Sequence, residues 1–188
     1  MGQYYKPVSI EKKEHLCSHD YNNGLKLMEH SYIGNDLVRA VESLLVEGGR
    51  WYGDRIVWAG DYADNEPDTK TTENPEGDNL YHLCSTTIKP EVPKKKQNYL
   101  VNLDTNEFVD LRKVPITDEG DWEDRKGKKH HYVMRIHPLP LLTCEGNGRG
   151  GGDYHKNHPL VGTWARNRVV MLSTKPKGGK EIVFDLVE

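Results

Sequence analysis

The stretch GNGRGGGDYH, residues 146–155, combines the residue types that most often hold an anion. Successive glycines allow backbone N–H groups to converge on one point, and an arginine adds a charged hydrogen-bonding fork. No Gly-Lys-Ser/Thr follows, and no helix is expected after the stretch, so it is neither a Walker A loop nor a dinucleotide fingerprint. The alternative is a flexible connection. The candidate ligand-binding residues are Arg149, Gly150, Gly151, Gly152, Asp153 and His155.

Two arginines occupy matching places in the similar segments WYGDRIV (51–57) and WARNRVV (164–170). Arg55 and Arg168 each precede two β-branched residues. In one interpretation each stem packs on the nearby tryptophan while the guanidinium pairs with a carboxylate. In the other, the two arginines line one cleft and add to an anion site. Both residues are therefore ligand-binding candidates.

His15, Cys17 and His19 alternate along a predicted strand, which would place all three side chains on one face. Such a set is compatible with zinc. The alternative is a small buried cysteine between two surface histidines, and we expect no bound metal and no cofactor. Lysine-rich runs at 94–96 and 126–131 could contact phosphates, but acidic residues flank both of them.

Local patterns predict several elements that would position these residues. A β-hairpin is expected over 3–19, a strand over 55–59, and a C-terminal hairpin from RVVMLS and EIVFDLV. Asn35 is a good N-cap, and the apolar spacing after it predicts one amphipathic helix over about 36–47, ended by Gly48-Gly49. The two prolines of IHPLPLLT argue against a regular helix there.

Three matched segments keep the same order in the two halves of the chain. VSIEKKEHL (8–16) resembles VNLDTNEFV (101–109), the two tryptophan-containing segments resemble each other, and LLVEGGR (44–50) resembles LLTCEGNGR (141–149). These matches predict an internal duplication over about 1–62 and about 97–175, joined by an acidic, loop-rich connector over 63–96. We expect a single domain over 1–188 of the α+β class, with antiparallel sheets built from two diverged hairpin-containing repeats and the helix packed on one face.

Composition narrows the class of protein. A net charge of −3 and a pI near 6.3 argue against nucleic acid as the main partner. Three widely spaced cysteines fit reduced thiols. No apolar run suits a secretion signal or a membrane span, so we expect a cytoplasmic protein with no membrane partner.

The segments MGQYYK, NGLKLMEH, GDRIVWAGDYAD and GNGRGGGDY…PLVGTWA resemble a family of small bacterial and bacteriophage hypothetical proteins. The resemblance implies a phage or mobile-element origin, and no activity or functional residue is carried over from it.

Two functions follow from the residues. The first is a non-enzymatic binding or regulatory protein that engages a host protein or a small nucleotide-like anion through the 146–155 loop. The alternative is a small metal-dependent phosphoesterase or nuclease that uses the aspartate and histidines of the same loop.

Overall fold

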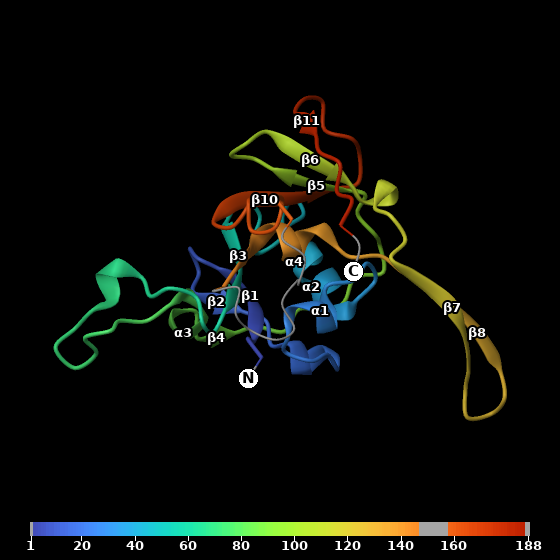
Figure 1. The fold of residues 1–188 in the computed structure, drawn as a ribbon. Coiled ribbons are helices and arrows are strands. Elements are labelled where there is room, and N and C mark those ends of the chain that lie inside the picture. The colour runs from blue at the N-terminus through green and yellow to red at the C-terminus, as the bar shows by residue number, and fades with distance from the viewer. Residues whose placement is uncertain (1, 147–157, 187–188) are drawn as a thin grey trace.

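A mixed nine-stranded sheet forms the centre of the computed structural model, which describes residues 2–146 and 158–186 (Figure 1). A separate two-stranded hairpin, β7 (Asp118–Glu123) and β8 (Lys129–Met134), projects away from this sheet. With its helices, the described part of the chain has the α+β class that the sequence predicts. Along the main sheet the order is β11 (Lys180–Glu181), β6 (Glu107–Asp110), β5 (Tyr99–Asn102), β10 (Asn167–Leu172), β3 (Arg55–Gly60), β1 (Tyr5–Ser9), β2 (Glu14–His15) and β4 (Thr86–Thr87), with β9 (Cys144–Glu145) paired to β3 off this path.

The prediction of purely antiparallel sheets is wrong, because three strand pairs are parallel. These pairs are β2–β4, β6–β11 and β3–β9. Each joins strands separated by a long stretch of chain, which a parallel pair requires and a tight hairpin cannot supply. The predicted C-terminal hairpin is also wrong, because β11 pairs in parallel with β6 and not with β10.

The predicted amphipathic helix is present as α2 (Asp36–Leu44), slightly shorter than expected. A second helix, α4 (Pro138–Thr143), lies where two prolines were expected to prevent one. Both prolines fall in its first turn, where backbone N–H groups have no partner within the helix, so a missing donor costs little. The remaining helical turns are short: η1 (Ser18–Tyr21), α1 (Leu27–His30), η2 (Pro67–Thr69), α3 (Leu80–Leu83) and η3 (Leu111–Lys113).

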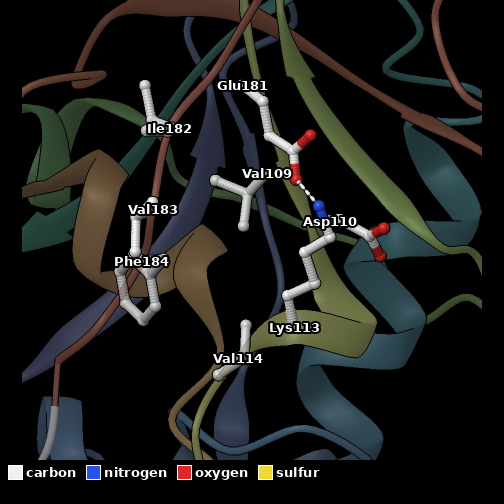
Figure 2. Close-up of a pocket in the computed structure, with 8 residues that line it drawn as sticks. All are labelled: Val109, Asp110, Lys113, Val114, Glu181, Ile182, Val183 and Phe184. Atoms are coloured by element: carbon white, nitrogen blue, oxygen red, sulfur yellow. Dashed lines mark hydrogen bonds and ion pairs between the residues drawn. The ribbon is translucent and has the colours of Figure 1, made fainter.

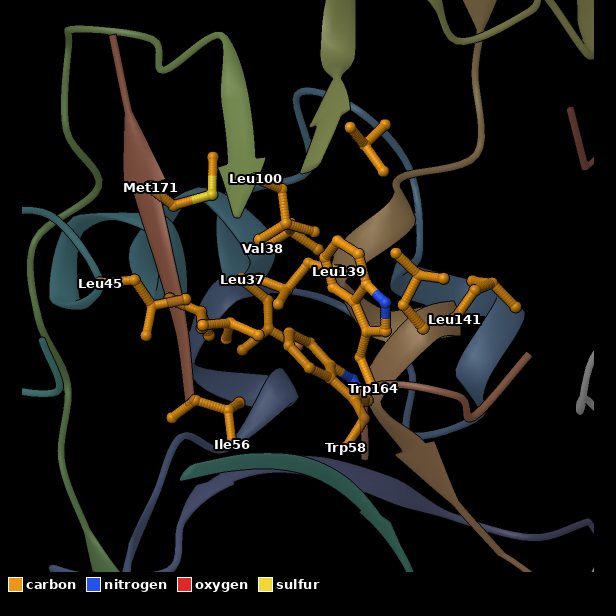
Figure 3. Packing of buried hydrophobic residues seen from close by; sticks show 14 of the residues in the cluster. Leu37, Val38, Leu45, Ile56, Trp58, Leu100, Leu139, Leu141, Trp164 and Met171 are labelled. Carbon is orange, nitrogen blue, oxygen red and sulfur yellow. The ribbon is translucent and has the colours of Figure 1, made fainter. Parts of the chain in front are cut away.

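The main hydrophobic core lies between one face of the sheet and the helices α2 and α4 (Figure 3). Sheet residues such as Ile56, Leu100 and Met171 pack there against Leu37 of α2 and Leu139 of α4. All five are at most 1% exposed. The core therefore draws on both halves of the chain.

The predicted connector contributes to the other face of the sheet. Its helix α3 places Leu80 against Val8, Val57 and Ala59, and β4 extends the sheet edge beside β2. Glu66, near its start, is paired with Arg166, which also contacts Glu145. The segment thus contacts both halves of the chain, while residues 63–79 are mostly loop, with only the short helical turn η2.

The strand registers of the two halves correspond position by position. Val8 lies opposite Val57 in the β1–β3 pair, and Val101 lies opposite Val170 in the β5–β10 pair. Where the halves meet, in the β3–β10 pair, Arg55 lies directly opposite Arg168.

Candidate functional site

The predicted anion loop cannot be placed, because Arg149, Gly150, Gly151, Gly152, Asp153 and His155 lie outside the described residues. Gly146, just before it, packs so closely on Gln3 and Tyr5 that a Cβ there would collide with the Tyr5 hydroxyl. The role of the loop therefore stays a prediction.

Arg55 and Arg168 lie side by side, and each is already paired with a carboxylate. The backbone N–H and Nε of Arg55 donate to Glu11 at 2.8 and 2.6 Å, and those of Arg168 donate to Asp104, both at 2.7 Å. The backbone N–H of Arg168, followed by its guanidinium, holds the pKa of Asp104 below its usual range. Each guanidinium thus has the carboxylate partner that the structural interpretation expects, and ligand binding by the two arginines stays a prediction.

The predicted zinc set does not assemble on one strand, because strand β2 ends at His15. Cys17 occupies the N-cap position of the 3₁₀ helix η1 without a side-chain capping hydrogen bond, and His19 lies within that helix. Across residues 2–146 and 158–186, no group of three or more His, Cys, Asp or Glu side chains is arranged to hold a metal ion.

A pocket of about 200 Å³, here called the cationic pocket, brings together basic residues from four separate segments. Arg39 comes from α2, Lys96 from the loop before β5, Arg112 from η3 and Arg135 from the position directly after β8. Ile33 and Leu111 supply apolar wall, and Gln97 and Asn98 supply amides.

The four cations of this pocket differ in how they are paired. Arg39 donates to the Pro93 carbonyl and, at 3.5 Å, to Asp36. Arg112 pairs with Asp110, which fixes the direction of its guanidinium and lowers the pKa of that carboxyl. Among the described residues, Lys96 and Arg135 have no ion-pair partner. The positive charge open to a ligand is therefore concentrated on Lys96 and Arg135.

Glu42 and His137 form a buried hydrogen-bonded pair in the wall of the cationic pocket. His137 Nε2 lies 3.0 Å from Glu42 Oε1, and His137 Nδ1 accepts from the Leu139 backbone N–H at 3.1 Å. Because Nδ1 is an acceptor, the proton sits on Nε2 and points at the carboxylate. Both ring nitrogens are thus engaged, and the pair serves to fix α2 against the start of α4.

The cationic pocket could not have been predicted from the sequence pattern. Lys96 belongs to a lysine run, but Arg39 lies on the polar face of an amphipathic helix, which usually faces solvent. Arg112 and Arg135 lie in no recognisable motif. The packing of α2, η3, the loop before β5 and the segment after β8 places these side chains around one hollow.

Comparison with known proteins adds no assignment: no protein-family model, no curated protein and no solved structure matches this chain. Within the described residues, no helix has the length and apolar character needed to cross a membrane.

Proposed function

We propose that this protein is a binding protein that takes a small anion, or the anionic end of a larger molecule, in the cationic pocket. The observation that carries the proposal is the pair Lys96 and Arg135, which line a partly enclosed hollow without a carboxylate partner. Charged side chains lining a pocket without an ion pair form strong hydrogen bonds to a carboxylate or phosphate.

The geometry supports binding in preference to catalysis. The one histidine of the pocket has both nitrogens engaged, so it has no lone pair available to accept a proton from a ligand. Arg112 is held by Asp110, which orients it before a ligand arrives. The volume is below the roughly 300–1,000 Å³ of most drug-sized sites, so it suits a compact anionic group.

Calorimetric titration with inorganic phosphate and with succinate, as separate probes, tests this proposal. Replacing both Lys96 and Arg135 with glutamine should weaken binding by about 10- to 100-fold for each charge-assisted hydrogen bond that the substitutions remove. Lys95→Gln is the matched control, because Lys95 is exposed in the same run and does not line the pocket.

The two probes separate the chemical source of the anion. Tighter binding of phosphate would identify a phosphorylated ligand, and tighter binding of succinate a carboxylate. Absence of saturable binding for both, or equal binding by the double variant, would contradict the proposal.

We also propose that the chain consists of two diverged copies of one unit. Matching contacts support this, beginning with the two arginine–carboxylate pairs, Arg55–Glu11 and Arg168–Asp104. Equivalent indole groups donate to equivalent glutamates, Trp51 to Glu14 and Trp164 to Glu107. The copies would be related by an approximate twofold axis through the Arg55–Arg168 pair.

The pairing of the outer strands supports longer copies than the sequence matches suggest. Glu14 of β2 lies opposite Thr86 of β4, and Glu107 of β6 lies opposite Lys180 of β11, both in parallel pairs. Each copy would therefore run through a final strand, β4 in the first and β11 in the second. In that arrangement much of the predicted connector belongs to the first copy.

A further inference from the structure

A groove of about 240 Å³ lies between η3 and the segment that follows β11 (Figure 2). Most of its wall is apolar, formed by Val109, Val114, Ile182 and Phe184, and Asp110 adds a carboxylate that is paired with Arg112. At its rim Lys113 forms an ion pair with Glu181, and Val183 is 77% exposed. This groove, here called the η3 groove, is separate from the cationic pocket.

The proposed duplication gives the η3 groove a counterpart in the first copy. Lys13 and Asn106 occupy matching turn positions, both with φ of 55°. Eight residues after each of them come Tyr21 and Val114. Thr86 of β4 and Lys180 of β11 occupy matching places in the two parallel pairs. Four residues after each of them come Pro90 and Phe184.

The two copies differ in the side chain at the position of Tyr21 and Val114. In the first copy the Tyr21 side chain is 8% exposed, and its hydroxyl donates to the Pro90 carbonyl at 2.9 Å. The hollow beside it is lined by Tyr21 and Pro90 but not by Leu16 or Ile88, the counterparts of Val109 and Ile182. In the second copy the smaller Val114 leaves Val109 and Ile182 lining the groove.

We propose that the η3 groove binds a small phenol-class molecule, whose ring takes the place that Tyr21 takes in the first copy. The volume suits a single ring, and the apolar walls suit its faces. The Glu181 carboxylate, held at the rim by Lys113 and Lys175, is the acceptor for the hydroxyl. The inference rests on the proposed duplication and is independent of anion binding in the cationic pocket.

The test is a titration of the ¹⁵N-labelled protein with p-cresol, the side-chain analogue of tyrosine, followed by NMR. Saturable shifts are expected at Val109, Val114, Ile182 and Phe184. Val114→Tyr should fill the groove from within and weaken p-cresol binding by at least about tenfold. The reciprocal variant Tyr21→Val should open a second p-cresol site beside Pro90.

Further measurements keep the test decisive. Val114→Leu fills less space, so it should weaken binding by a smaller factor and serves if Val114→Tyr does not fold. The Lys96→Gln, Arg135→Gln double variant should bind p-cresol like the wild type, which separates this site from the anion site. No shifts at the groove residues, unchanged binding by folded Val114→Tyr, or equal binding of cyclohexanol would overturn the proposal.

Discussion

At the scale of single residues, His30 shows how burial lowers the pKa of a side chain and so makes the stability of the fold depend on pH. The side chain is fully buried, its Nδ1 lies 3.1 Å from the Gly24 carbonyl, and its Nε2 accepts from the Trp58 indole N–H at 2.8 Å. Because Nε2 is an acceptor, the ring is neutral with its proton on Nδ1. Burial lowers the pKa of His30 to about 4.

This depressed pKa predicts a loss of stability in mild acid. Unfolded His30 takes up a proton near pH 6.5, and folded His30 only near pH 4, so the unfolded state binds more protons between these values. The stabilisation is complete above about pH 6.5 and falls by about 3 kcal/mol as the pH drops to 4. Urea unfolding of the wild type and of His30→Gln, measured across this range, checks the difference in slope.

The control for that measurement is the comparison of the wild type with His30→Gln above about pH 6.5, where folded and unfolded His30 are both neutral. The difference in stability between the two proteins should be constant there. A His30→Gln profile parallel to that of the wild type would show that another group causes any acid destabilisation.

At the scale of elements, the stability of α2 depends on Asn35, the N-cap residue that precedes the helix. The Asn35 Oδ1 accepts from the backbone N–H groups of Leu37 and Val38 at 3.0 and 3.4 Å, and its Nδ2 donates to Asn23 at 2.7 Å. The side chain thus satisfies helix donors and ties α2 to the turn after η1.

Asn35→Ala should therefore lower the free energy of unfolding by about 1–2 kcal/mol, because both helix donors lose their acceptor. Asn35→Asp keeps the acceptor for the helix donors but sets a second acceptor against the Asn23 Oδ1, so it should destabilise less than alanine but more than no change. Urea unfolding followed by circular dichroism measures both. An alanine variant as stable as the wild type would contradict this role for Asn35.

Elements with a strong local pattern could be predicted from the sequence, and the others could not. Helix α2 and the hairpins β1–β2 and β5–β6 have caps, turns and apolar spacing that act within a few residues. The hairpin β7–β8 escaped prediction because its first strand, DEGDWE, is charged and mostly exposed. Helix α4 escaped because proline is unfavourable inside a helix but acceptable in its first turn.

At the scale of the whole molecule, the decisive contacts join segments far apart in the chain. No local pattern indicates that β11 runs parallel to β6, or that η3, α2 and the segment after β8 surround one pocket. The matched segments in the two halves were the one long-range signal in the sequence. They predicted the internal duplication, and their two tryptophan-containing segments include parts of the central strands β3 and β10, which pair with each other.

A chain cut between the proposed copies should hold together without a covalent link. Helix α2 of the first copy packs on β10 of the second, and α4 of the second packs on β3 of the first. Each half alone would expose part of a shared core, including Leu37 and Trp58 on one side and Leu139 and Met171 on the other. That exposed apolar surface favours association.

Co-expression of residues 1–94 and 95–188, cut within the exposed lysine run, tests this expectation. Native mass spectrometry should find a one-to-one complex with nearly the 21.5 kDa mass of the intact chain. Met171→Asp should abolish the complex, because Met171 is buried in the shared core at 1% exposure and an unpaired charge there is costly. If instead the two fragments separate and each is folded by circular dichroism, the halves are independent domains, and a single core that needs both copies is excluded.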